Sequence, residues 1–136
     1  MQDLVELLRN NPYPGRGIVV GKNRVYYFIM GRSVNSRNRI FVKTDDGIRT
    51  EAHKPELVED PSLIIYHPVR TMGDALVVTN GDQTDTIVEK GDFRSGCMTR
   101  EFEPDEVWAA LNDDNKISLY CNVDGQVSIY NKYLGD

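Results

Sequence analysis

A basic segment without acidic residues is the part of the sequence whose side chains most clearly suggest a chemistry. Between residues 15 and 43 the chain carries seven Lys and Arg residues and no Asp or Glu: Arg16, Lys22, Arg24, Arg32, Arg37, Arg39 and Lys43. Guanidinium groups match phosphate oxygens with paired hydrogen bonds, so this segment could bind a phosphorylated ligand. The alternative is that each of these side chains faces outward from an amphipathic strand.

The charge of the rest of the chain decides which phosphorylated ligands fit. The formal net charge is −5, and residues 51–136 hold seven basic against seventeen acidic residues. A surface of this sign repels a polyanion over most of the molecule. We therefore expect a small phosphorylated molecule as the ligand rather than nucleic acid.

Polar side chains also follow three apolar runs, at points where a rigid sheet could present them to a ligand. Residues 31–39 combine three arginines with amide and hydroxyl groups, and residues 80–85 contain Asn80 and Asp82. Tyr66 ends a third apolar run. The alternatives are solvated turns for the two loops and, for Tyr66, a core tyrosine whose hydroxyl has a hydrogen-bond partner.

Metal and nucleophile chemistry has little support in the residue types. The only histidines are His53 and His67, the only cysteines are Cys97 and Cys121, and their spacing fits neither a zinc site nor a disulfide framework. The sequence also has no Gly-x-Ser-x-Gly elbow and no glycine-rich phosphate loop ending in Lys-Ser/Thr. We expect reduced, inert thiols, no metal site and no cofactor.

The elements that must position these side chains are mostly short strands. Alternating and apolar runs separated by Gly, Asn and Asp turns predict antiparallel strands. The predicted strands are 18–20, 25–30, 39–44, 48–53, 63–67, 75–79, 116–122 and 126–133. The predicted helices are 3–9, 82–90 and 103–111, the last with Pro104 in its first turn. This pattern indicates an α+β fold rich in antiparallel sheet.

Length and composition bound the organisation of the chain. Its 136 residues, 40% hydrophobic and 27% charged, fit one globular domain over 1–136 and exclude a wholly disordered protein. No apolar run approaches the about 20 residues that cross a bilayer. The N-terminal residues carry acids and lack the basic start of a secretory signal. We expect a cytoplasmic protein that does not bind membranes.

Several segments, taken in order, carry a resemblance to a known family: 14–21 (Pro-Gly-Arg-Gly-Ile-Val-Val-Gly), 31–37, Tyr66 with Arg70 and Gly73-Asp74, and 77–85. Together they resemble the archaeal-type inosine monophosphate (IMP) cyclohydrolase family, and residues 103–106 are a looser match. The resemblance implies a layered αββα sandwich similar to N-terminal-nucleophile hydrolases, without self-processing. It also implies cyclodehydration of 5-formamidoimidazole-4-carboxamide ribotide to IMP in purine biosynthesis.

The resemblance also implies roles for individual residues. By position in the family motifs, Arg37, Tyr66 and Glu103 are the expected catalytic residues. Arg37 would stabilise oxygen charge, Tyr66 would relay a proton and Glu103 would orient or deprotonate the amide. The expected substrate-binding residues are Arg16, Arg32, Asn80 and Asp82, with the two arginines on the ribotide phosphate.

The chain departs from the family pattern after its acidic stretch. Asp105-Glu106 passes directly into Val107-Trp108, and the family's Thr-Pro-Arg segment is missing. We therefore expect a shortened member of the family. One alternative is a non-catalytic, purine-ribotide-binding or oligomerising relative, which leaves a homo-oligomer open, and another is an unrelated small-molecule hydrolase.

Overall fold

Two antiparallel sheets organise the computed structural model, which describes residues 3–12, 15–31, 33–61, 64–99, 108–123 and 126–133. Within these residues a hairpin forms one sheet and seven strands form the other, in the order β3-β4-β5-β6-β7-β8-β9. The hairpin strands are β1 (Arg16–Gly21) and β2 (Arg24–Ile29). The large sheet contains β3 (Arg39–Lys43), β4 (Gly47–Ala52), β5 (Val69–Met72), β6 (Ala75–Thr79), β7 (Trp108–Asn112), β8 (Lys116–Val123) and β9 (Gln126–Tyr133).

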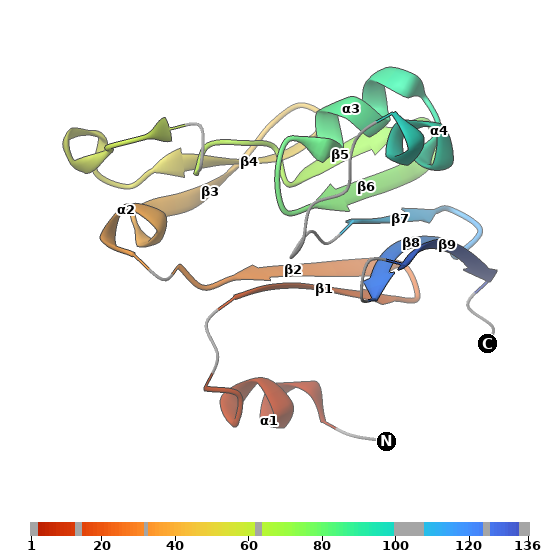
Figure 1. Cartoon of the computed structure of the whole chain (residues 1–136), viewed down its shortest axis with the longest axis horizontal. Helices are drawn as coiled ribbons and strands as arrows, with labels where there is room; N and C mark the ends of the chain where they lie inside the picture. Colours follow the sequence, from red (N-terminus) through yellow and green to blue (C-terminus); the bar gives the residue numbers. More distant parts are fainter. Residues whose placement is uncertain are drawn as a thin grey trace.

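The helices are α1 (Leu4–Arg9), α2 (Val34–Arg37), α3 (Gln83–Lys90) and α4 (Phe93–Met98), with a 3-10 turn at Pro55–Leu57. Of these, α3 and α4 cover one side of the large sheet, and the hairpin lies on the other side (Figure 1). The helix α3 contacts β5 and β6, while β1 contacts β7 from the hairpin side. The helix α1 lies beyond the hairpin, away from the large sheet (Figure 1), and none of its residues is buried.

The core lies between the large sheet and the helices α3 and α4. It contains Val77, Ile87, Phe93, Cys97, Trp108, Ala110 and Tyr120. The rings of Trp108 and Tyr120 stack with their centroids 4.7 Å apart. Cys97 is fully buried and forms no disulfide bond with another described residue.

The two core helices are joined by a tight turn. Gly91 ends α3 with φ +70°, a left-handed conformation that glycine adopts without strain. Asp92 then begins α4, because its carboxylate accepts a hydrogen bond from the Ser95 amide at 2.9 Å. The helices also approach closely where Gly96 faces Ile87, since a Cβ at Gly96 would lie 2.6 Å from the Ile87 Cα.

Most of the predicted elements are confirmed. The hairpin formed by β1 and β2, the strands β3, β4 and β6, the helices α1 and α3 and the terminal hairpin of β8 and β9 all occur near the predicted boundaries. The predicted α+β, antiparallel class is also confirmed. Sequence analysis missed β5, α4 and the short helix α2, which lies inside the predicted loop 31–39.

The predicted helix 103–111 is wrong from Trp108 onward. Residues 108–112 form β7, a central strand between β6 and β8, and residues 103–107 lie outside the described part of the chain. Residues 108–111 are all buried, because the strand has the helices on one side and the hairpin on the other. A strand buried on both faces is continuously apolar, so its sequence lacks the alternation that would distinguish it from a helix.

The predicted strand 63–67 is also wrong over Ile64–His67, and Leu63 lies outside the described residues. This segment is held beside β4 by a side chain instead of a strand ladder. The Thr50 hydroxyl donates to the Ile64 carbonyl at 2.6 Å and accepts from the Tyr66 amide at 3.0 Å. The next strand, β5, begins only after Pro68.

Candidate functional site

Two tyrosine hydroxyls from different parts of the fold meet at the centre of the candidate site. The hydroxyl oxygens of Tyr27 and Tyr66 lie 2.6 Å apart, and either phenol can be the donor. Tyr27 lies on β2 of the hairpin, whereas Tyr66 lies in the segment that joins β4 to β5. This hydrogen bond therefore links the hairpin to the large sheet.

The backbone of Tyr66 is fixed by Thr50, a fully buried residue of β4. The Thr50 amide donates to the Tyr66 carbonyl at 2.9 Å, and the Tyr66 amide donates to the Thr50 hydroxyl at 3.0 Å. Tyr66 itself is only 7% exposed. Its ring therefore has a defined position even though the segment is not a strand.

The surroundings of Tyr27 keep its phenol protonated. Burial raises the pKa of Tyr27 well above its usual value, and the neighbouring Tyr66 raises it further, while the positive charges of Arg16 and Arg39 act in the opposite direction. The Tyr27 ring also meets the Phe41 ring edge-on, with centroids 6.0 Å apart. Tyr27 thus keeps its proton at neutral pH and can donate a hydrogen bond.

Arg16 connects the hairpin to the end of β6. Its guanidinium donates one hydrogen bond of 2.8 Å to the carbonyl of Asn80, a residue that is 6% exposed. Three predicted site residues are therefore connected through the hairpin: Arg16 bonds to Asn80, and its charge acts on Tyr27, the hydrogen-bond partner of Tyr66. The remaining N–H groups of a guanidinium that makes one such bond are geometrically able to bind an anion.

Asn80 and Asp82 are positioned by a hydroxyl network between β6 and α3. The Thr79 hydroxyl lies 2.8 Å from the Thr84 hydroxyl and accepts a hydrogen bond from the Gly81 amide at 3.2 Å. Asp82 is the residue directly before α3. These bonds define the path of the predicted loop 80–85 as it enters the helix.

Arg37 lies in a separate hydrogen-bonded unit at α2. Ser33 and Ser36 cap this short helix reciprocally, and the Arg37 Nε donates to the Gly31 carbonyl at 2.9 Å. Arg39 follows, and its Nε donates to the Ser36 carbonyl at 2.6 Å. Within the described residues, no hydrogen bond or ion pair joins the exposed Arg37 to Tyr66. The other two predicted site residues, Arg32 and Glu103, lie outside the described part of the chain.

Sequence analysis singled out neither Tyr27 nor Thr50, the two residues that hold Tyr66, whereas it placed Arg39 in the basic segment. The alternation of β2 places Tyr27 on the opposite side of the strand from Tyr26, which is 50% exposed. The sequence contains this alternation but does not say which of the two tyrosines faces the large sheet. The role of Thr50 has no local signal, because it depends on a partner fourteen or more residues away.

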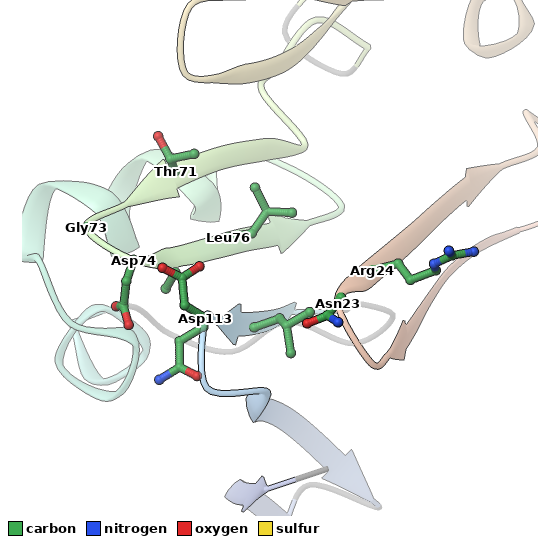
Figure 2. A pocket seen from close by; sticks show the side chains of 10 residues that line it. Asn23, Arg24, Thr71, Gly73, Asp74, Leu76 and Asp113 are labelled. Atoms are coloured by element: carbon green, nitrogen blue, oxygen red, sulfur yellow. The ribbon is translucent and has the colours of Figure 1, made fainter. Parts of the chain in front are cut away.

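A separate open groove of about 370 Å³ lies at the turns of the strands. Figure 2 shows Asn23 of the hairpin turn, Asp74 of the β5–β6 turn and Asp113, which follows β7, around this groove, while the Arg24 side chain extends away from the two aspartates. Among the described residues, none of the predicted site residues lines this groove.

The search for metal ligands and membrane spans adds two findings on the described part of the chain. Among those residues, His, Cys, Asp and Glu side chains nowhere form a group of three or more that could hold a metal ion. Likewise, none of the described helices has the length and apolar character needed to span a membrane.

This is an α+β fold in which a tyrosine pair links two sheets and an arginine bonds to Asn80 at the end of β6. Such an arrangement can form a binding site for a small molecule. The family model described as IMP cyclohydrolase-like protein matches residues 13–110, and the chain belongs to this family. Over 84 residues it is 37% identical to an IMP cyclohydrolase of Methanococcus maripaludis, a match that covers 57% of this chain. The match spans 41% of that curated relative's length.

Proposed function

We propose that this protein is an IMP cyclohydrolase, a hydrolase-type enzyme that closes the last ring of the purine. One observation supports the proposal: the hairpin links Tyr66, through Tyr27, to Arg16 and its partner Asn80, and all of these residues lie within the part of the chain that matches the family. The substrate would be 5-formamidoimidazole-4-carboxamide ribotide and the products IMP and water. We also propose that the fold is a layered αββα sandwich similar to that of N-terminal-nucleophile hydrolases.

The proposed reaction needs proton movement at an oxygen atom. The carboxamide nitrogen attacks the formyl carbon and forms a carbinolamine, and the carbinolamine then loses its hydroxyl as water while a ring nitrogen loses a proton. Tyr66 is proposed to donate a proton to the departing hydroxyl. Its position is well defined, because Thr50 holds its backbone and Tyr27 holds its hydroxyl. Arg37 is proposed to stabilise oxygen charge and Glu103 to orient or deprotonate the amide.

The ribotide phosphate has a proposed place beside the tyrosine pair. Arg16 is exposed, and its guanidinium donates to the Asn80 carbonyl through Nη1, a geometry in which the other side of the guanidinium can bind phosphate oxygens. Arg32 is the second proposed phosphate ligand. Asn80 and Asp82, at the turn into α3, are proposed to bind the rest of the ribotide.

The setting of the enzyme follows from the same proposal. A purine ribotide is a small soluble metabolite, so we propose a cytoplasmic enzyme of purine biosynthesis that binds neither nucleic acid nor membranes. A homo-oligomer remains compatible with the proposal.

Incubation with the formylated ribotide tests the function directly. Ring closure changes the ultraviolet absorbance of the purine, so the expected result is a time-dependent appearance of IMP that scales with protein concentration. Tyr66→Phe should remove most of the rate, whereas Tyr26→Phe, a change on the same strand as Tyr27 but at an exposed hydroxyl, should leave it intact. Binding of IMP without turnover would contradict the enzyme and favour a ribotide-binding relative.

A further inference from the structure

We infer that Tyr27 is a positioning residue for the reaction: its phenol fixes the hydroxyl of Tyr66 in the direction that proton transfer requires. This inference rests on the proposed function, in which Tyr66 moves the proton. It adds a residue from the hairpin to a site whose proposed proton donor lies in the large-sheet part of the fold.

The geometry around Tyr66 leaves its hydroxyl in need of such a partner. Thr50 fixes the backbone of Tyr66 at both its amide and its carbonyl. The backbone bonds do not determine the direction of the O–H bond, because a phenol hydroxyl can rotate about its C–O bond. The bond of 2.6 Å to Tyr27 supplies this missing restraint.

Tyr27 is itself held by its own surroundings. Its backbone is paired with Ile18 across the hairpin, and its ring meets Phe41 of β3 edge-on. Because Tyr27 is held protonated, it can keep donating to the Tyr66 oxygen when Tyr66 has given its proton to the departing hydroxyl. The proton that Tyr66 loses is replaced by the one that the ring nitrogen releases, so the pair returns to its starting state.

A purely structural hydroxyl pair makes a different prediction from a positioning pair. If Tyr27 only supports packing, its phenol affects the stability of the fold and leaves the chemistry of folded molecules unchanged. If Tyr27 acts through Tyr66, its phenol matters for turnover only while the Tyr66 hydroxyl is present. A double-mutant cycle separates these cases.

The experiment compares Tyr27→Phe, Tyr66→Phe and the double variant in the cyclisation assay. We expect Tyr27→Phe to lower kcat about 10- to 100-fold with KM little changed, since one charge-assisted hydrogen bond is lost. The double variant should be no slower than Tyr66→Phe alone. The matched control is Tyr26→Phe on the same strand, whose exposed hydroxyl accepts from Arg24 at 3.4 Å and which should keep the wild-type kcat.

Several outcomes would overturn the inference while leaving the proposed function intact. An unchanged kcat in Tyr27→Phe means that the phenol positions nothing. Losses that multiply in the double variant mean that Tyr27 acts independently of Tyr66. A wild-type protein that does not cyclise the ribotide at all instead overturns the proposed function.

Nuclear magnetic resonance of tyrosine labelled with ¹³C at Cζ gives a readout that does not depend on turnover. The Tyr66 resonance should shift in Tyr27→Phe and stay in place in Tyr26→Phe. The reciprocal measurement, a shift of the Tyr27 resonance in Tyr66→Phe, serves if Tyr27→Phe does not fold. Unmoved resonances in both directions would overturn the hydrogen bond and with it the inference.

Discussion

The Tyr66 hydroxyl is the atom on which the proposed chemistry depends most. It belongs to a residue that is 7% exposed, so replacing Tyr66 with Phe keeps the ring contacts and removes only the oxygen. The oxygen has one described partner atom, the Tyr27 hydroxyl, which is partly buried. Under the proposed mechanism we therefore expect loss of the oxygen to have a modest effect on stability and a large effect on proton transfer.

Tyr66→Phe is expected to lower the cyclisation rate by about 10²- to 10⁴-fold, the usual contribution of a general acid or base. The free energy of unfolding should fall by about 1 kcal/mol, because one hydrogen bond is lost. Turnover and thermal midpoint measured on the same preparation check both numbers. An unchanged rate with a lowered midpoint would make Tyr66 a structural tyrosine.

Arg16 provides the prediction for the phosphate. Arg16→Gln should weaken binding of IMP roughly 10- to 100-fold, the cost of one charge-assisted hydrogen bond, and should leave binding of the nucleoside inosine little changed. Calorimetric titration of both ligands measures the difference. The control is Lys90→Gln, an exposed change of equal charge at the end of α3. Equal losses for nucleotide and nucleoside would place the phosphate elsewhere.

At the scale of elements, an ion-pair network joins the β3–β4 turn to α3 through β5. The Arg70 guanidinium donates to Asp46 at 2.8 Å and to Asp85 at 2.9 Å. Because the hydrogen bond from Arg70 holds the pKa of Asp46 below the usual value of an aspartate, the charged carboxylate stabilises the folded state. This contribution is fully present above the usual aspartate pKa and is lost as the pH falls through the lower pKa of the folded state.

Asp46→Asn should therefore flatten the acid side of the stability profile. The difference in the free energy of unfolding from wild type should be at most about 1 kcal/mol at neutral pH, because both side chains are partly exposed, and should shrink below about pH 4. Chemical denaturation at a series of pH values provides the measurement. A difference between the two proteins that grows as the pH falls would contradict this assignment.

The contact between α3 and α4 gives a second prediction for elements. Gly96→Ala would place a Cβ 2.6 Å from the Ile87 Cα, so the helices must move apart at a cost of about 1–3 kcal/mol. Gly21→Ala is the control, because no atom lies within 4 Å of a Cβ at that position. Thermal denaturation of the two variants makes the comparison. Equal midpoints would mean that the helices adjust without strain.

At the scale of the whole molecule, two of the attachments between described residues are hydrogen bonds that hold the hairpin to the rest of the fold. One is the candidate site, through the tyrosine pair and Arg16. The other is a reciprocal pair in which the Asn23 amide donates to the Asn115 side chain at 2.7 Å and the Asn115 side chain donates back at 3.0 Å. Both asparagines have φ +59°, so each occupies a left-handed turn position.

Asn115→Gly should loosen this second attachment without straining the turn, because glycine accepts the same backbone conformation. Amide hydrogens of β1 and β2 should then exchange faster, while those of α3 and α4 keep their rates. Hydrogen exchange followed by mass spectrometry or NMR resolves the two regions. Uniformly faster exchange would show that the asparagine pair stabilises the whole fold and not the hairpin alone.

The sequence predicts most of the architecture where its signals are local. Turn residues around 21–24 and 45–47 and the glycine after α3 mark element ends correctly, since each acts through its own backbone geometry. Trp108–Asn112 is read wrongly because burial on both faces removes the periodic signal. Tyr66 is placed wrongly in a strand because the side chain of Thr50, distant in sequence, replaces the ladder.

The candidate site shows the same division between local and distant signals. Arg16, Tyr66 and Asn80 are predicted from the sequence, and in the structure Arg16 bonds to Asn80 while Tyr66 bonds to Tyr27 of the same hairpin. Tyr27 is not, since the choice between it and Tyr26 depends on which side of β2 meets the large sheet. The family resemblance supplies candidates one residue at a time, whereas the tyrosine pair exists only in three dimensions.

The way the hairpin is attached has a thermodynamic consequence. Within the described residues, neither β1 nor β2 is paired with a strand of the large sheet, so lifting the hairpin breaks side-chain contacts but no ladder between the two sheets. A ligand that contacts both Arg16 and Tyr66 binds only while the hairpin is attached to the large sheet. By mass action, such a ligand shifts the equilibrium toward the attached hairpin. Ligand occupancy of the site is thus linked to the asparagine pair at the other end of the hairpin. The hydrogen-exchange rate of the Asn23 amide should therefore fall when such a ligand binds.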